Sequence, residues 1–233
     1  MSGAATAVAE RADVIEQIEK VATDLFIRNG YHGVSYLAIA KELGITHSNV
    51  HYYYRTKPAL AEAVLKRAAG ETLKATEAIW DAKGLTLLDK FVRMRDWIYR
   101  AYLRYNPDGK GGRPWGLLSR FSMDADSLSS EMRQMIRAML KKLEGDVRAA
   151  VTTAIAQSEL QADTPLEGIT LQIMSVMYQT GQLTRHAAGF SRLDELLMWT
   201  ATVIFKAYGS KPQRPIEWPP LLAPKLHFGN TES

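Results

Sequence analysis

The stretch between residues 35 and 60 constrains this fold most, because its pattern specifies two short helices joined by a tight turn. Ser35 can cap the first helix by accepting from its free backbone N–H groups. Gly44 stands where a helix can end in a left-handed residue, and Thr46 can cap the next helix. The buried face of the first helix is expected to consist of Leu37, Ile39, Ala40 and Leu43. This order of cap, helix, glycine turn and second cap is typical of a helix-turn-helix.

The second helix of this motif carries polar side chains that suit contact with duplex DNA. A helix-turn-helix lays its second helix in the major groove, where each base pair presents a distinct pattern of donors, acceptors and methyl groups. Short polar side chains let the helix approach closely, and asparagine can form two hydrogen bonds with adenine. Contacts to base edges or phosphates are predicted for Thr46, His47, Ser48, Asn49 and Tyr52. Phosphate contacts that fix the register are predicted for Ser35, Tyr36, His51 and Lys57.

The same window resembles the DNA-binding domain of the TetR (tetracycline-repressor) family. The matching positions are Phe26, the pair Gly30-Tyr31, Ser35, the pairs Ile39-Ala40 and Leu43-Gly44, the segment 46–54 and Lys57. Two positions depart from the family pattern, since Ser48 replaces the usual glycine and His51 replaces the usual tyrosine. The resemblance covers roughly residues 11–70. It implies a DNA-binding regulator, often a repressor, that works as a homodimer.

Composition excludes several other classes of protein. The chain has 233 residues, 46% hydrophobic and 23% charged, which is the balance of an ordinary globular protein. It contains no cysteine, so disulfides, thiolate metal sites and thiol redox sensing are excluded. No apolar run is long enough to span a membrane, and the N-terminus lacks a leader pattern, so a cytoplasmic location without a membrane partner is expected. The net charge of +4 is a modest excess, so the DNA prediction depends on the motif.

Helical spacing of apolar residues recurs along the chain, and no segment alternates with period two. We therefore predict an all-α fold of about nine helices: a three-helix helix-turn-helix head and a larger helical domain for ligand binding and dimerisation. The expected divisions are a flexible arm (1–10), the DNA-binding head (11–70), the helical domain (71–209) and a proline-rich tail (210–233). Thr164 and Glu167 are expected to form a capping box, and Ser191 to cap the last helix. In the tail, Trp218, Leu221 and Leu222 are candidates for packing on the body.

Aromatic and methionine side chains gather in the middle of the chain, where an apolar pocket for a small-molecule effector is one interpretation. The predicted pocket residues are Phe91, Met94, Tyr102, Trp115, Phe121, Met174 and Tyr178. For any single one of them, an ordinary place in the core is the alternative. The last two long helices carry apolar stripes that are predicted to form a dimer interface through Ile169, Ile173, Val176, Leu193, Leu197 and Ile204. The alternative is that these stripes pack only within the subunit.

Two other function classes stay open at this point. An enzyme would need paired acids, an activated nucleophile or a cofactor motif, and none is found: Asp124 and Asp126 lie in a polar loop, and His186 stands alone. No catalytic residue, cofactor or metal site is therefore predicted; His47 and His51 are one turn apart but lack a third ligand. An architectural or division-related DNA-binding protein would use the same head. The preferred hypothesis is a homodimeric regulator that binds a palindromic or near-palindromic operator and answers a small hydrophobic effector.

Overall fold

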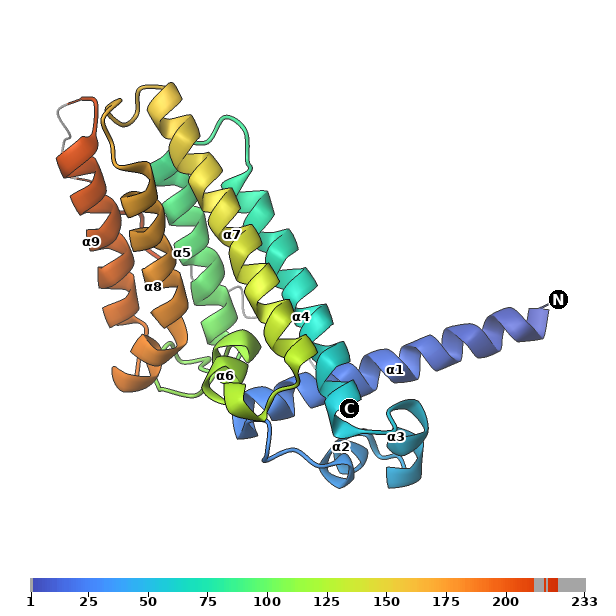
Figure 1. Ribbon diagram of the computed structural model, residues 1–233. Coiled ribbons are helices and arrows are strands. Elements are labelled where there is room, and N and C mark those ends of the chain that lie inside the picture. The colour runs from blue at the N-terminus through green and yellow to red at the C-terminus, as the bar shows by residue number, and fades with distance from the viewer. Residues whose placement is uncertain (1, 212–215, 217, 222–233) are drawn as a thin grey trace, which may run out of the picture.

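The structure is a computed structural model that describes residues 2–211, 216 and 218–221. Within these residues it is all-helical and has no strand, which confirms the predicted fold class (Figure 1). The helices are α1 (Ser2–Asn29), α2 (Tyr36–Leu43), α3 (His47–Tyr53), α4 (Lys57–Trp80), α5 (Leu87–Leu103), α6 (Leu117–Met123), the short 3-10 helix η1 (Ala125–Ser127), α7 (Ser130–Ala156), α8 (Leu166–His186) and α9 (Ser191–Tyr208).

The helix-turn-helix consists of α2 and α3, and both predicted caps are present. The Ser35 hydroxyl accepts from the Ala38 N–H at 3.2 Å, and the Thr46 hydroxyl accepts from the Asn49 N–H at 3.2 Å. Gly44 adopts a φ of 65° at the end of α2, a conformation that glycine takes with little strain. The caps satisfy backbone donors that a helix of only seven or eight residues leaves free, so they define where each short helix begins.

The buried face of α2 is narrower than the sequence predicts. Ile39 and Ala40 are buried and Leu43 is half-buried, as expected. Leu37, however, is 68% exposed, and its prediction as a core residue is wrong. It precedes Ile39 by two residues, which places it nearly on the opposite side of an α-helix.

The apolar core of the head, by which we mean α1, α2, α3 and the first turns of α4, continues into the rest of the molecule. One buried cluster joins Phe26 of α1 and Val50 of α3 to Phe121 of α6 and Met132 of α7. The Phe26 and Phe121 rings meet edge to face with centroids 5.3 Å apart. The head is therefore packed directly on α6 and α7 in addition to being connected through α4.

The body consists of α5 to α9 and the remainder of α4. Figure 1 shows α4, α5, α7, α8 and α9 side by side as a bundle, with α2 and α3 beyond one end of it. The second buried cluster fills this bundle with side chains from α4, α5, α7, α8 and α9. No helix among the described residues has the length and apolar character needed to cross a membrane.

Several predicted termini need correction. Helix α1 begins at Ser2, so residues 2–10 are part of this helix and do not form the expected arm. Their alanine-rich sequence favours a helix. Helix α8 begins without a side-chain cap, since Thr164 donates to the Gln161 carbonyl and Glu167 pairs with Arg148. Helix α9 begins at Ser191, with Phe190 at the cap position and no side-chain cap.

The capping box in the body belongs to α5, where the sequence analysis did not place one. The Asp89 N–H donates to the Thr86 hydroxyl at 3.1 Å, and the Thr86 N–H donates to the Asp89 carboxylate at 3.0 Å. These two reciprocal bonds satisfy donors at the start of the helix. They fix the beginning of α5 at Leu87.

The described part of the tail packs on the body. Trp218 and Leu221 contact the bundle core, as predicted, while Leu222 lies outside the described residues. The buried Arg95 of α5 donates to the Pro219 carbonyl at 2.8 Å and lies over the Trp218 ring. Its Nε forms an ion pair with Asp194 of α9 at 2.7 Å, so one arginine holds two elements and the tail together.

Two glycines with open space around them allow a test of the left-handed conformation at Gly44, in the turn between α2 and α3. At neither Gly44 nor Gly145, in the middle of α7, would an added Cβ come within 4 Å of an atom beyond the neighbouring residues and the backbone of its own helix. Gly44→Ala should lower the free energy of unfolding by about 1–2 kcal/mol, because alanine is strained at positive φ. Gly145→Ala should raise it by about 0.5–1 kcal/mol, because glycine is a poor helix residue. Urea unfolding at one fixed protein concentration measures both.

The opposite signs of the two changes are the control. If both alanine variants changed stability in the same direction, the left-handed turn at Gly44 would not be the constraint described here.

Candidate nucleic-acid interface and ligand cavity

Helix α3 is held at the outer edge of the head by a single fully buried side chain. Val50 has no exposed surface and is the anchor of the helix in the head core. The polar residues around it face outward and are exposed: Thr46, His47, Ser48, Asn49, His51 and Tyr52. Figure 1 shows α3 at the end of the molecule, away from the bundle. The predicted major-groove residues thus share one accessible helix, as entry into a groove requires.

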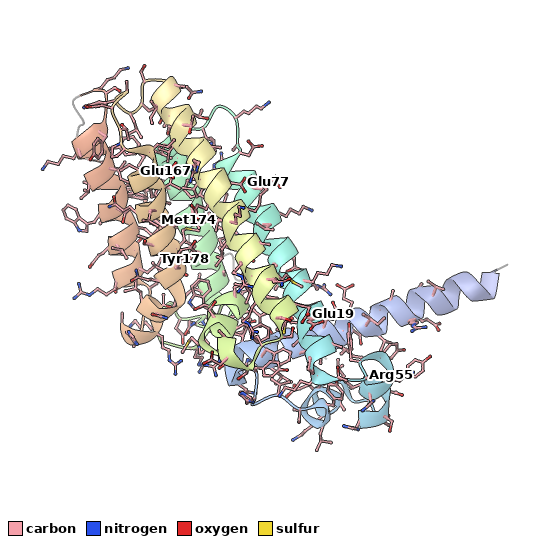
Figure 2. The ribbon with its side chains drawn as sticks, viewed as in Figure 1. Glu19, Arg55, Glu77, Glu167, Met174 and Tyr178 are labelled. Carbon is pink, nitrogen blue, oxygen red and sulfur yellow. The ribbon has the colours of Figure 1, made fainter. Side chains whose placement is uncertain are left out.

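Two cations that the sequence analysis did not select lie beside this helix. Arg55 follows α3 directly, is exposed, and lies next to it in Figure 2. Arg11 of α1 lies over the exposed Tyr52 ring, with its guanidinium carbon 5.9 Å from the ring centroid. Phosphate contacts commonly come from such flanking arginines. The position of Arg55, immediately after the second helix of the motif, was the available signal in the sequence.

Tyr36 is in a different environment from the one its predicted phosphate contact requires. Its ring packs on His47 and His51, with centroids 6.0 and 5.8 Å away. Its hydroxyl is buried and has no hydrogen-bond partner among the described residues. Burial, with a smaller effect of Tyr31, raises the pKa of Tyr36 to about 12. The Tyr36 ring therefore packs against the two histidines of α3. A contact with phosphate would require its buried hydroxyl to become exposed.

Lys57 and Ser35 keep positions compatible with their predicted phosphate contacts. The Lys57 ammonium donates to the His32 carbonyl at 3.3 Å and lies 4.9 Å from the Tyr31 ring centroid. Partial burial lowers the pKa of Lys57. Ser35 is exposed, although its hydroxyl already serves as the cap of α2. Tyr54, which follows α3, is half-buried and its hydroxyl donates to Glu19 of α1 at 2.5 Å. Burial, more than this bond, raises the pKa of Tyr54.

The seven predicted ligand residues do not surround one cavity. Phe91, Met94, Tyr102 and Met174 are fully buried in the bundle core. Phe121 belongs to the cluster under the head, and Tyr178 of α8 is exposed (Figure 2). Trp115 alone of the seven lines the cavity described next. Their aromatic and methionine spacing mainly reflects core packing, the alternative considered above.

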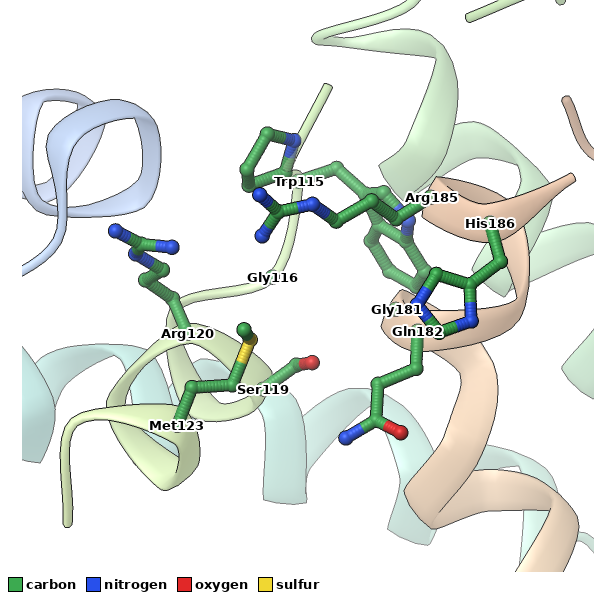
Figure 3. A pocket seen from close by; sticks show the side chains of 10 residues that line it. Trp115, Gly116, Ser119, Arg120, Met123, Gly181, Gln182, Arg185 and His186 are labelled. Atoms are coloured by element: carbon green, nitrogen blue, oxygen red, sulfur yellow. The ribbon is translucent and has the colours of Figure 1, made fainter. Parts of the chain in front are cut away.

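A cavity of about 400 Å³ lies between α6 and α8, close to the head (Figure 3). Helix α6 contributes Ser119, Arg120 and Met123, and α8 contributes Gly181, Gln182, Arg185 and His186. The segment before α6 adds Pro114, Trp115 and Gly116, with the Trp115 indole N–H donating to the Thr184 hydroxyl at 2.8 Å. Sequence spacing does not reveal this site, because its walls come from segments about 60 residues apart.

The six predicted dimer residues lie inside the subunit. Ile169, Ile173 and Val176 of α8 and Leu193, Leu197 and Ile204 of α9 are all buried. They belong to the bundle core, which includes side chains of α5 and α7, so these stripes are already covered within one chain. These six side chains are therefore already covered within one subunit. No three His, Asp or Glu side chains of the described residues are grouped to hold a metal ion.

Tyr36→Phe tests the buried hydroxyl. At neutral pH the free energy of unfolding should be unchanged or higher, because the variant removes a buried hydroxyl that lacks a partner. In the wild type, the unfolded tyrosine loses its proton near its ordinary pKa of 10.0, whereas the folded one keeps it to about 12. The wild type should therefore lose stability relative to the variant as pH rises through this interval. Urea unfolding at neutral pH and at about pH 11 compares them.

Equal alkaline losses in the two proteins would show that Tyr36 is not shielded in this way. Tyr52→Phe is the matched control, since Tyr52 is exposed on the same surface.

Comparison with known proteins supports the assignment of this head. Residues 18–64 match the family described as bacterial regulatory proteins, tetR family. A search of curated protein sequences gives no match. A TetR transcriptional regulator from Chloroflexus aurantiacus superposes with a TM-score of 0.73 at 20% identity, covering 86% of this chain and 98% of that one. The TetR transcriptional regulator from Legionella pneumophila gives 0.66 at 21% identity, covering 81% and 96%.

Reduced NemR of E. coli gives a TM-score of 0.68 at 14% identity, covering 86% of this chain and 100% of NemR. At these identities the structural matches establish the shared fold, and the family match establishes the nature of the head. TetR-family regulators are DNA-binding proteins and not enzymes. Residues 18–64 of this chain are therefore a TetR-family head, and the chain as a whole has the fold of TetR-family transcriptional regulators.

Proposed function

We propose that this regulator is a homodimeric repressor that a small ligand releases from a palindromic or near-palindromic operator. The observation that carries the proposal is α3, whose polar side chains are exposed around the buried anchor Val50. A helix presented in this way can enter the major groove with its side chains directed at base edges. Asn49 is the strongest candidate for base recognition, because its amide can bond two positions of one adenine.

One head covers too few base pairs for useful affinity, which favours a dimer. Two heads of one dimer would bind half-sites about 34–36 Å apart, on the same side of the duplex. The exposed apolar residues of α8 and α9 are the proposed contact surface: Leu171, Tyr178, Trp199 and Val203. Leu171 and Tyr178 are seven residues apart, and Trp199 and Val203 four, so each pair lies on one helix face. Large exposed apolar side chains grouped in this way are typical of an interaction surface.

Ligand release is proposed to act through the contacts between head and body. Helix α4 joins the two directly, and the cluster of Phe26 and Phe121 joins the head to α6, one wall of the cavity. A ligand that favours one arrangement of α6 would change the position of the head. A coupling of about 1–3 kcal/mol is enough to change operator affinity roughly 5- to 150-fold. The predicted cytoplasmic location is consistent with a DNA partner.

Selection from random duplex DNA tests the central proposal. The full-length protein should enrich a two-fold symmetric sequence, and Asn49→Ala should bind it about 10-fold or more weakly, with relaxed preference at one base pair per half-site. Fluorescence anisotropy at fixed salt measures the affinities. Gln157→Ala is the control, since it removes an exposed amide at the far end of α7. No enriched sequence, or equal binding by Asn49→Ala and wild type, would overturn the proposal.

Trp199→Glu tests the proposed dimer surface. Trp199 is 60% exposed in one subunit, so a glutamate at this position would stay in water in the monomer. In the proposed dimer the same charge would be buried, which is unfavourable. The dimer dissociation constant should rise about 10-fold or more, as measured by sedimentation equilibrium. Leu37→Glu adds the same charge at a similarly exposed leucine of α2 and should leave association unchanged. Identical association of Trp199→Glu and wild type would place the interface elsewhere.

A further inference from the structure

The cavity between α6 and α8 has an unusual charge balance. None of its ten lining residues is acidic, whereas Arg120, Arg185 and His186 supply cationic or titratable nitrogen atoms. Trp115 and Met123 supply apolar surface in the same cavity. Figure 3 shows the Arg120 and Arg185 side chains, from different walls, extending toward the same side of the cavity. This combination suits a ligand that has one negative group and an apolar part.

Arg120 has binding capacity that the protein itself does not use. Its Nε is buried and has no hydrogen-bond partner among the described residues. Its nearest carboxylate is Asp124, at a long 3.8 Å. A buried guanidinium donor without a partner is unfavourable, because it has lost water without gaining a bond. An acceptor brought into the cavity would remove this deficit.

Arg185 is similarly available on the opposite wall. It forms no ion pair with any carboxylate of the described residues and is exposed. Its backbone packs closely on the segment before α6, since a Cβ at Gly112 would lie 2.6 Å from the Arg185 carbonyl oxygen. The walls also meet closely at Gly181, where a Cβ would lie 2.4 Å from the Ser119 hydroxyl. Two arginines are thus presented from closely packed helices.

We propose that this cavity binds a small amphipathic carboxylate as the effector of the repressor, an inference that rests on the proposed function. The carboxylate is held between Arg120 and Arg185, and the apolar part lies on Trp115 and Met123. Paired guanidinium groups match the geometry of a carboxylate, with charge-assisted hydrogen bonds on both oxygens. A neutral analogue of the same shape keeps the apolar contact and loses these bonds.

The same arginine connects the cavity to the DNA-binding head. The guanidinium of Arg120 lies against the turn after α1, where a Cβ at Gly30 would be 2.3 Å from its Nη2. Asp124, its ion-pair partner, accepts from the Tyr31 N–H at 2.8 Å in that turn. Next to it, His32 and Ser127 are joined by a hydrogen bond of 2.6 Å. A bound carboxylate competes with Asp124 for Arg120 and so loosens the hold of the α6–η1 segment on the head.

Matched acid and amide probes test the site in the full-length protein. Benzoate, 1-naphthoate and decanoate are titrated beside benzamide, 1-naphthamide and decanamide by isothermal calorimetry, with sodium phosphate as a purely inorganic anion. At least one carboxylate should bind about 10-fold or more tightly than its amide and than phosphate. Arg185→Gln should lose this preference. Arg113→Gln, which removes an exposed charge outside the lining, should keep it.

Three results with the carboxylates would each overturn the proposal. These are equal binding of acids and amides, unchanged carboxylate binding by Arg185→Gln, and no carboxylate binding at millimolar concentration. Binding of phosphate as tight as that of the best carboxylate would show an inorganic anion site and would also overturn it. Thermal melting of each variant checks that the fold is retained.

Measuring operator binding with and without the carboxylate distinguishes failure of this inference from failure of the proposed function. With the selected operator, the bound carboxylate should weaken wild-type DNA binding at least about 5-fold and leave Arg185→Gln unaffected. Asp124→Asn should lower operator affinity without ligand and keep carboxylate binding. If an operator is found but no carboxylate binds, the inference fails and the DNA-binding function stands. If carboxylates bind as expected but no operator is enriched, the proposed function fails while the site remains.

Discussion

The edge-to-face contact of Phe26 and Phe121 is the interaction on which the rest of the arrangement depends. It places a ring of the first helix of the head against a ring of α6, with centroids 5.3 Å apart. Both side chains are fully buried, so the contact excludes water as well as aligning the rings. Because protein interiors are close-packed, α6 cannot shift far without disturbing the head core. The head and the cavity wall therefore behave as neighbouring parts of one packed unit.

Hydrogen bonds around the Phe26–Phe121 contact also join the body to the head. Asp124 and Ser127, which follow α6, bind the turn between α1 and α2, and Tyr105 after α5 donates to Asp24 of α1 at 2.5 Å. Each bond joins the body to the base of the head and leaves α3 free. Burial raises the pKa of Tyr105, with the bond to Asp24 as the second cause. The tyrosine stays protonated and continues to donate at physiological pH.

The exposed surfaces divide into three kinds with different chemistry. The outer face of α3 is polar and flanked by arginines, which suits nucleic acid. Helices α8 and α9 expose four large apolar side chains, Leu171, Tyr178, Trp199 and Val203, which suit association of subunits. The cavity near α6 is cationic with an aromatic floor, which suits a small anion with an apolar part. Helix α8 carries parts of two of these surfaces, with Leu171 and Tyr178 exposed and Gly181, Gln182, Arg185 and His186 in the cavity lining nearer its end.

Local sequence determined the helices and the exposed polar face of α3. Ser35, Gly44 and Thr46 act through backbone bonds within a few residues, so their roles were predictable from spacing. The termini of α1 and α8 were less predictable, since helix propensity and competing side-chain partners decided them. Which apolar residues of α8 and α9 stay exposed depended on tertiary structure: Ile173 and Leu197 are covered by other helices of the same chain, whereas Leu171 and Trp199 are not. The cavity lined by Arg120 and Arg185 likewise depends on tertiary packing. The two arginines are far apart in sequence and line one cavity only because α6 packs against α8.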